Sequence, residues 1–170
     1  DIKTLKFCDA LILPGVGAFD PAMINLSKTD LIPSIIDWVN NGKPLLGICL
    51  GLQLLFESSD EGALNGLGVI KGHICRLPQE KNERIPHIGW SPISKINECP
   101  ILENYPDYNW MYFVHSYSAC PSEKKNIVAT VFFCSKGHAE YECTKYIHLE
   151  SGRFSRIGHS FVLFIGDQPI

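Results

Sequence analysis

The chain has 170 residues, of which 45% are apolar and 11% aromatic, so it can bury the core of one domain, and disorder is excluded as its main state. Fifteen Lys and Arg oppose 18 Asp and Glu, and the net charge of −3 gives no strong field of one sign to attract nucleic acid or an anionic membrane. Because no apolar run reaches the roughly 18 residues of a spanning helix and no signal-peptide pattern opens the chain, we expect a soluble, cytoplasmic protein without nucleic-acid or membrane partners.

The first predicted strand and helix lie in the N-terminal quarter of the chain. Residues 8–13 form a short apolar run that ends at Pro14, which is typical of a buried parallel strand followed by a loop. Apolar residues then recur at helical spacing over residues 30–40, with Asp30 as the expected N-cap and Gly42 after the last turn.

The next segments repeat this order. Residues 43–48 predict a second buried strand, and residues 50–57 predict a helix directly after it. Since strands and helices alternate, we expect an α/β fold with a parallel sheet. Short β-prone segments then follow one another without helices and predict an antiparallel or mixed addition: residues 69–77, 85–90 and 110–117.

The C-terminal part of the chain carries little pattern. From Phe132 onward the sequence has neither a sustained helical period nor a clean alternation of apolar and polar residues. No internal repeat, low-complexity stretch or break in composition divides the chain, so we expect residues 1–170 to form a single domain.

The cysteines do not predict a disulfide framework or a metal centre. There are seven, an odd number, and they are scattered along the chain, which fits a reduced compartment. The sequence has no C-x-x-C pair and no histidine pair four residues apart, so we expect no metal site.

The strongest local motif is the G-x-C-x-G segment from Gly47 to Gly51, where a predicted strand turns sharply into a predicted helix. Such a turn holds its central residue in strained backbone angles and leaves room only for glycine two residues to either side. A helix N-terminus favours a thiolate at Cys49, and the amide of Leu50 is a candidate oxyanion donor. Cys49 is therefore the predicted nucleophile; the alternative is a cysteine that only fills space in the turn.

A second glycine-rich segment, residues 14–19, follows the first predicted strand. Ligands bind at this end of parallel α/β sheets, and the flanking glycines allow the amide of Val16 to turn toward a substrate. The segment therefore predicts a second oxyanion donor. The alternatives are a plain loop or half of a dinucleotide-binding fingerprint, which lacks its third glycine here.

A cysteine nucleophile needs a base, and the chain has six histidines. His148 is the favoured candidate because Glu150, two residues on, would lie on the same face of an extended strand and orient the imidazole. His138 has a glutamate at the same spacing but lies in a more polar stretch. His115 lies in a better predicted strand without such a carboxylate, and we expect it to be a hydrogen-bonded histidine in aromatic surroundings.

Together, these motifs resemble the triad class of glutamine amidotransferases and, within it, the family of glutaminase subunits of imidazole glycerol phosphate synthase. The resemblance covers about residues 1–131 and rests on segments that follow the family's order and spacing: Ala10–Met23, Gly42–Gly62, Gly66–Gly72, Arg84–Trp90 and Trp110–Tyr117. The elbow is common to all triad amidotransferases, whereas the PGVGAF, PHIGW and YFVHSY segments point to this subunit.

The resemblance implies a class I glutamine amidotransferase-like, flavodoxin-like fold: a mixed, mainly parallel sheet flanked by helices, with an antiparallel addition. It implies hydrolysis of glutamine to glutamate and ammonia through a thioester on Cys49, without a cofactor. The ammonia would pass to a (β/α)8-barrel cyclase subunit in a heterodimer that makes imidazole glycerol phosphate for histidine biosynthesis. Since ammonia released without an acceptor is wasted, we expect low glutaminase activity until the partner shifts the loop near Val16.

The resemblance also implies roles for individual residues. The substrate-binding residues would be Gly15, Gln53, Glu61, Ser116 and Tyr117, with Glu61 at the ammonium end. The oxyanion donors would be the amides of Val16 and Leu50. The partner interface would include Pro86, His87 and Trp90, and Ser91 stands where the family often has asparagine.

The chain departs from the family at both ends. The family begins with a strand and helix that carry a DYGxGN-like turn, which are absent before Asp1, and we expect the exposed strand edges to lower stability. In place of QFHPEKS, the chain has YIHLES, and the tail after Val131 is predicted to be diverged or translated from a shifted reading frame. The alternatives to an enzyme are therefore a catalytically dead or truncated scaffold that keeps the partner surface, or a different cysteine hydrolase on this fold.

Overall fold

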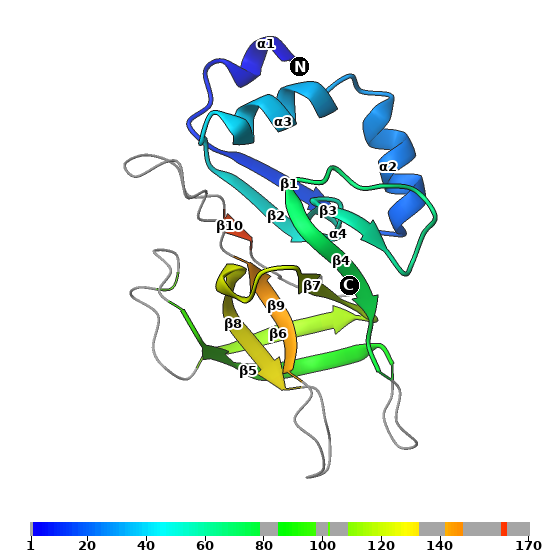
Figure 1. Cartoon of the computed structure of the whole chain (residues 1–170), viewed down its shortest axis with the longest axis vertical. Helices are drawn as coiled ribbons and strands as arrows, with labels where there is room; N and C mark the ends of the chain where they lie inside the picture. The colour runs from blue at the N-terminus through cyan, green and yellow to red at the C-terminus, as the bar shows by residue number, and fades with distance from the viewer. Residues whose placement is uncertain are drawn as a thin grey trace.

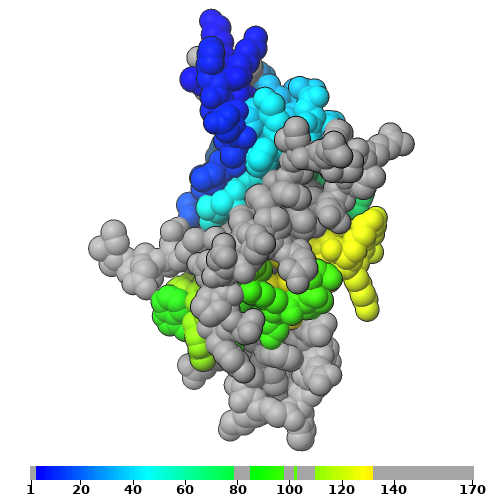
Figure 2. Space-filling model, turned by 90° about the vertical axis from the view of Figure 1, so that its left-hand side faces the viewer, coloured from blue at the N-terminus to red at the C-terminus, as the bar shows by residue number. Residues whose placement is uncertain are grey.

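A computed structural model describes residues 2–78, 85–97, 102, 109–132, 142–147 and 161–162. In Figure 1, three helices lie at one end of the molecule: α1 (Ile2–Leu5), α2 (Phe19–Ser27) and α3 (Ile32–Asn40). The view in Figure 2, turned by 90°, also places the N-terminal segment at this end. None of the described helices has both the length and the apolar character needed to cross a membrane.

The first sheet is parallel and has the order β1-β2-β10. Strands β1 (Leu11–Gly15) and β2 (Leu45–Cys49) pair in register from Leu11 opposite Leu45 to Gly15 opposite Cys49. The short strand β10 (Phe161–Val162) pairs parallel to β2 on its other side. Since β1 and β2 run in the same direction, Gly15 and Cys49 lie together at the carboxyl edge of this sheet.

The second sheet is mixed, and the third is antiparallel. The second sheet, in the order β3-β4-β7, contains β3 (Phe56–Ser59), β4 (Ile70–Arg76) and β7 (Tyr117–Pro121), with β3 parallel and β7 antiparallel to β4. The third, in the order β6-β5-β8-β9, contains β6 (Asn109–His115), β5 (His87–Lys95), β8 (Ile127–Phe132) and β9 (Glu142–Ile147). The 3-10 turn η2 (Lys124–Asn126) leads into β8. The expected α/β class with an antiparallel addition is confirmed.

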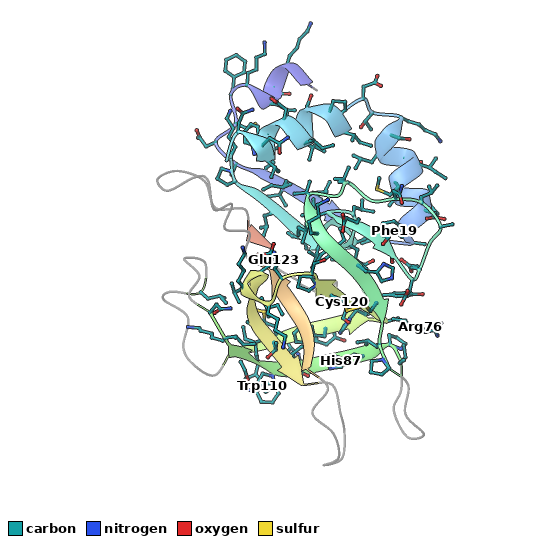
Figure 3. All side chains as sticks on the ribbon, in the orientation of Figure 1. Phe19, Arg76, His87, Trp110, Cys120 and Glu123 are labelled. Carbon is teal, nitrogen blue, oxygen red and sulfur yellow. A yellow bond between two sulfur atoms is a disulfide. The ribbon has the colours of Figure 1, made fainter. Side chains whose placement is uncertain are left out.

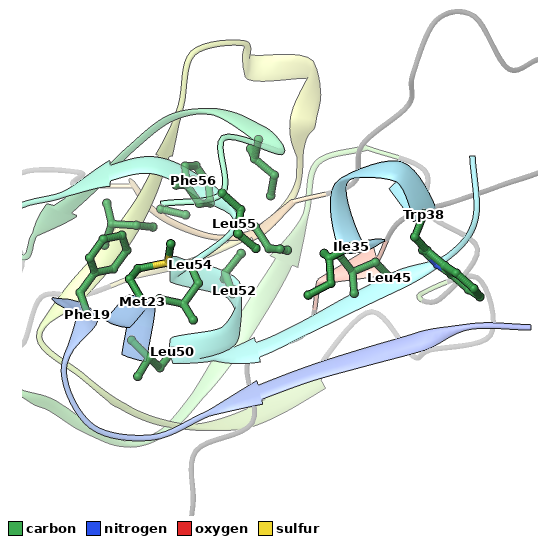
Figure 4. Close-up of a cluster of buried hydrophobic side chains, with 14 residues drawn as sticks. Phe19, Met23, Ile35, Trp38, Leu45, Leu50, Leu52, Leu54, Leu55 and Phe56 are labelled. Carbon is green, nitrogen blue, oxygen red and sulfur yellow. The ribbon is translucent and has the colours of Figure 1, made fainter. Parts of the chain in front are cut away.

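The main hydrophobic core lies between the helices and the first two sheets. Phe19 of α2 and Phe56 of β3 are both fully buried in it, and Ile35 and Trp38 of α3 close it from the other side. Figure 4 shows these side chains with the leucines that follow β2. The segment from β2 to β3 therefore contributes side chains to this core from both the parallel sheet and the turn that follows it.

The helix predicted over residues 50–57 is wrong in its second half. Helix α4 (Leu50–Gln53) is one turn long, and the chain then becomes the strand β3. Phe56 pairs in parallel with Ile70 of β4, so the strand provides backbone hydrogen bonds for this apolar run. A run that is buried on all sides fits either a helix or a strand, and here tertiary pairing decides.

The prediction for the start of α3 is also corrected. Asp30 is not the N-cap: its φ is 56°, and Leu31 occupies the cap position. The hydroxyl of Thr29 accepts a hydrogen bond from the Leu31 amide at 3.3 Å. The chain therefore enters α3 through a left-handed residue, a conformation that aspartate tolerates better than most residues.

The boundaries of the expected strands shift. The strand expected at residues 8–13 begins at Leu11, because the Cys8 amide bonds to the Leu5 carbonyl at the end of α1. The strand expected over residues 110–117 is interrupted at Ser116 and continues as β7. The strands expected over residues 43–48, 69–77 and 85–90 are present as β2, β4 and β5.

Helix α2 and the strands of the tail, β9 and β10, were not predicted from the sequence. Helix α2 has only Phe19 and Met23 buried, so its apolar stripe is narrow. Strand β9 pairs antiparallel with β8, although the sequence of β9 does not alternate cleanly. Packing onto the core for α2, and pairing with β8 for β9, therefore define these elements more than local sequence does.

One pair of cysteines is joined, which the scattered, odd set did not predict. Cys75 of β4 and Cys120 of β7 form a disulfide, with Cα atoms 6.2 Å apart. Because His73 pairs with Cys120 in the ladder, the two cysteines are diagonal neighbours across these strands. The disulfide fastens β7 to β4. Within the described parts of the chain, no three His, Cys, Asp or Glu residues form a group that could hold a metal ion.

A hydrogen-bond chain joins the end of β3 to β4. Ser58 Oγ lies 2.7 Å from Nδ1 of His73, and Nε2 of His73 lies 2.6 Å from Oδ1 of Asp60. The other oxygen of Asp60 accepts from the Arg76 amide at 2.8 Å. The Arg76 hydrogen bond, followed by that of His73, lowers the pKa of Asp60.

This lowered pKa makes the stability contribution of Asp60 depend on pH. The contribution is present above the unfolded pKa of about 3.9 and disappears as the pH falls through the lower folded value. We expect Asp60→Asn to be less stable than wild type at pH 6 and the gap to narrow on acidification. Urea unfolding at pH 6 and below the unfolded pKa of about 3.9 would measure the difference in free energy of unfolding between wild type and Asp60→Asn, with the exposed Asp9→Asn as control. A difference that grows in acid would contradict the stabilising role of the Asp60 carboxylate.

Candidate active site

The sharp turn predicted around Cys49 is confirmed. Cys49 ends β2 and precedes α4 with φ 54° and ψ −121°, and it is one of two described non-glycine residues with positive φ. Such angles are costly for a residue with a Cβ and persist where the surrounding structure enforces them. The turn projects the side chain from the end of the strand, as a nucleophile elbow does.

The glycines beside Cys49 are required by close packing. A Cβ on Gly51 would lie 1.8 Å from the Leu13 carbonyl oxygen of β1. A Cβ on Gly47 would lie 2.8 Å from Cα of Leu52. The backbone of β1 at Gly51, and that of α4 at Gly47, therefore come too close for any side chain at these positions.

The glycine-rich segment after β1 lies beside the elbow. Gly15 is opposite Cys49 in the ladder, and a Cβ there would be 3.0 Å from Cβ of Leu50. The next residue, Val16, is 74% exposed, and Gly17 has a φ of 101°. The structure thus places the loop that carries Val16 beside the elbow that carries Leu50, the two residues whose amides are the predicted oxyanion donors.

The side chain of Cys49 is half-buried and packs against the second hydrophobic cluster, which lies in the antiparallel sheet around Phe113. The sulfur is therefore not sealed in the main core, and it lies where the parallel sheet meets the antiparallel sheet. Because α4 is a single turn, a thiolate here gains from the nearby amides at its N-terminus and not from a long helix dipole.

Two of the expected substrate-binding residues have features suited to a ligand. Oε1 of Gln53, in the turn after Cys49, is buried without a hydrogen-bond partner in the described structure, and the residue is only 9% exposed. A buried acceptor without a partner costs free energy until a donor reaches it. Glu61 uses Oε2 to accept from the Phe19 amide at 3.1 Å.

Ser116 and Tyr117 lie at the junction between β6 and β7. The Ser116 carbonyl accepts from the Leu77 amide at 2.8 Å, and Tyr117 packs against the main core. Both residues are therefore held in place by β4 and the segment after it.

The expectation for His115 is confirmed. It is 6% exposed, and its Nδ1 lies 2.8 Å from the Tyr117 carbonyl oxygen, to which it donates. Its Nε2 lies 3.2 Å from Nδ1 of His87, and Nε2 of His87 lies 3.1 Å from Ser91 Oγ. Phe113 lies beside both imidazoles, with ring centroids 5.3 Å from His87 and 5.9 Å from His115.

The expected base and its orienting carboxylate, His148 and Glu150, lie outside the described residues, as does the alternative His138. Strand β9 is described up to Ile147. The assignment of these residues to the triad stays a prediction.

The residues expected at the partner interface lie on β5 or directly before it. Pro86 precedes it, His87 is half-buried, and Trp90 is 60% exposed with its ring 5.6 Å from that of Tyr112. Ile88 and, on β6, Trp110 are each 60% exposed as well. Figure 3 shows Trp110 at the end of the molecule opposite α1.

These side chains form one apolar surface, which we call the aromatic face. Its members lie opposite one another in the β5–β6 ladder: Ile88 with Val114, Trp90 with Tyr112 and Pro92 with Trp110. An exposed apolar surface of this kind is typical of a binding site for another protein. From the sequence, only the segment from Pro86 to Trp90 was expected at the partner interface. Pro92 and the members on β6 were missed, although strict alternation along β5 and β6 was the available signal.

The fold, the elbow and the loop beside it are those of an amidotransferase. The chain matches the family model of class I glutamine amidotransferases over residues 1–153, and it belongs to that family. It is similar to the imidazole glycerol phosphate synthase subunit HisH of Prochlorococcus marinus strain NATL2A, with 82% identity over 133 residues, 78% of this chain and 64% of that protein. For the HisH subunit of Synechococcus sp. strain CC9902, the identity is 56% over 131 residues, 77% of this chain and 62% of that protein. The chain spans less than two thirds of the length of these curated relatives.

Solved structures support the same fold. A crystal structure of a glutamine amidotransferase superposes with a TM-score of 0.63 at 13% identity, over 95% of this chain and 72% of that one. A glutamine amidotransferase from Thermotoga maritima gives 0.58 at 19% identity, over 94% and 56%. The fold class expected from the sequence is confirmed.

Proposed function

We propose that this chain is the glutaminase part of an imidazole glycerol phosphate synthase, which hydrolyses glutamine and passes the ammonia to a cyclase partner. The observation that carries the proposal is the strained elbow at Cys49 directly opposite the glycine-rich segment that starts at Gly15. The similarity to HisH subunits supports the choice of this pathway over other amidotransferases.

In the proposed reaction, the thiolate of Cys49 attacks the side-chain carboxamide of glutamine. The carbonyl oxygen becomes an oxyanion, which the amides of Val16 and Leu50 would stabilise. The amide nitrogen then takes a proton and leaves as ammonia, and a thioester remains on the sulfur. Water hydrolyses the thioester to glutamate and restores the thiolate.

The proton transfers need an imidazole near the sulfur. We assign this role to His148, oriented by Glu150, on the spacing of these residues alone. His115 is a weaker candidate because both of its ring nitrogens are already in hydrogen bonds, to the Tyr117 carbonyl and to His87.

The two ends of the substrate would be held by oxygen atoms that can accept a further hydrogen bond. Oε1 of Gln53 is a buried acceptor, and a substrate N–H would satisfy it. Glu61 binds the Phe19 amide through one carboxylate oxygen, and the other would accept from the substrate ammonium. Ser116 and Tyr117, held by β4, would position the backbone of glutamine.

The aromatic face is the proposed docking surface for the cyclase. Trp90 lies near its centre, and buried tryptophans often dominate the binding energy of an interface. We expect Trp90→Ala to weaken binding to the cyclase about 30-fold, or about 2 kcal/mol. Calorimetric titration would measure this, with Phe7→Ala as control because Phe7 is 87% exposed near α1; equal losses in the two variants would contradict the assignment.

Glutamine hydrolysis with and without the cyclase tests the proposed function. We expect low turnover by the isolated chain and a large increase when the cyclase and its nucleotide substrate are added. Full turnover without the partner would contradict the proposed dependence on it. Tight binding to the cyclase without hydrolysis under any condition would instead support a scaffold, which the exposed aromatic face also favours.

A further inference from the structure

The loop of residues 16–18, which carries the proposed oxyanion donor, is held at both ends. Upstream, Gly15 is fixed in the β1–β2 ladder and packs against Leu50. Downstream, Phe19 begins α2 and is fully buried in the main core. Between these points the chain has only three residues in which to move, so the position of the Val16 amide depends on how firmly each end is fixed.

The downstream end is fixed by a carboxylate. Asp20, in the first turn of α2, accepts hydrogen bonds from two successive amides of the loop after β3: that of Ala63 at 3.0 Å to Oδ2 and that of Leu64 at 3.0 Å to Oδ1. Charge-assisted hydrogen bonds are stronger than neutral ones, and both oxygens are used. These bonds join segments more than 40 residues apart in sequence.

Gly62 makes this arrangement possible. A Cβ on Gly62 would lie 2.0 Å from Oδ1 of Asp20 and 3.2 Å from the ring of Phe19. Only glycine therefore lets the carboxylate reach the two amides. The Glu61 carboxylate adds a parallel bond to the Phe19 amide, so the strand–loop segment that carries Glu61 holds the start of α2 through two adjacent residues.

We propose that Asp20 is a positioning residue for the glutaminase reaction: by fixing the start of α2 to residues 63 and 64, it sets where the Val16 amide can point. The inference rests on the proposed function. Asp20 has no role in attack or proton transfer, and it acts through the backbone of the loop. The same loop after β3 carries Glu61, so binding of the substrate ammonium is linked to the oxyanion donor through one short segment.

Two variants and a control test this proposal in the complex with the cyclase. Asp20→Ala removes both acceptors, Asp20→Asn keeps one, and Asp37→Ala removes an exposed carboxylate from α3. We expect Asp20→Ala to lower kcat about 10-fold with KM within about two-fold, since a misplaced oxyanion donor acts on the transition state, and Asp20→Asn to lower it less. Asp37→Ala should match wild type. A kcat for Asp20→Ala within about two-fold of wild type, or a KM that rises as much as kcat falls, would overturn the proposal.

Hydrogen exchange tests the role of Asp20 independently of whether the chain hydrolyses glutamine. We expect the amides of residues 16–18 to exchange at least about five-fold faster in Asp20→Ala than in wild type or Asp37→Ala, because local opening costs less when an anchor is removed. If wild type does not hydrolyse glutamine with the cyclase, the proposed function fails, whereas faster exchange would still support the anchor. Unchanged exchange in a folded Asp20→Ala would overturn the anchor even if the wild-type complex is active.

Discussion

Replacing Cys49 by serine is expected to lower kcat/KM for glutamine hydrolysis by at least about 10³-fold, as removal of a catalytic nucleophile does in other hydrolases. The serine hydroxyl has almost the size of the thiol, so the strained turn and the packing against the cluster that contains Phe113 should persist. What is lost is the nucleophile, because a hydroxyl is not ionised at neutral pH without a strong base. Initial rates in the complex with the cyclase would measure the loss.

A second measurement connects the loss to the sulfur itself. An electrophilic glutamine analogue should label the wild-type chain once, at Cys49, and should not label Cys49→Ser; mass spectrometry of the peptides would locate the label. Cys8→Ser is the matched control, since Cys8 is also half-buried but lies at the end of α1. Glutaminase activity of Cys49→Ser close to that of Cys8→Ser would remove Cys49 from the mechanism.

The elbow could be predicted from the sequence because the residues that it requires are close together in the chain. A strand that reverses into a helix within two residues needs glycine where backbones touch, and both glycines stand at fixed offsets from Cys49. The paired strands were readable for a similar reason, since β2 and β4 are apolar runs bounded by turn residues. Local chemistry was therefore sufficient for the elbow and for much of the sheet, and the role of Cys49 as nucleophile stays a prediction.

The segment after α4 was not readable in this way. Residues 54–57 fit a helix by composition, but residues 54 and 55 form a turn, and the pairing of Phe56 with Ile70 of β4 starts a strand at Phe56. The anchor of the oxyanion loop is a further case, because Asp20 meets its two amides across more than 40 residues of sequence. No periodicity or motif reports such a contact.

The geometry also connects the two halves of the proposed mechanism. Cys49 packs against the antiparallel sheet through the cluster around Phe113. The opposite face of the same sheet, one pair along the β5–β6 ladder, carries Trp90 in the aromatic face. Phe113 stacks beside His87, which precedes this face on β5. A partner docked on the aromatic face would therefore contact the sheet against which the nucleophile packs, which gives a physical route for activation by the partner.

The second large effect concerns stability. We expect Gly51→Ala to destabilise the fold by more than about 3 kcal/mol, a large part of the about 5–15 kcal/mol that holds a typical domain folded. The new Cβ would lie 1.8 Å from the Leu13 carbonyl oxygen and 2.7 Å from its carbon. Both atoms belong to the backbone of β1, which is paired with β2 and cannot turn aside as a side chain would.

Gly68→Ala is the control that distinguishes the effect of this clash on the free energy of unfolding from the general cost of replacing a glycine. Gly68 has a φ of 63°, and a Cβ there would meet only the Glu57 side chain, at 4.0 Å. Its expected cost is therefore the left-handed conformation alone, about 1–2 kcal/mol. Urea unfolding of both variants would measure the difference, and equal losses would mean that β1 moves away from the elbow at little cost. In that case Cys49 would no longer be held opposite Gly15, and labelling of its sulfur by the glutamine analogue should slow even in the folded variant, because the strained turn depends on the same contact.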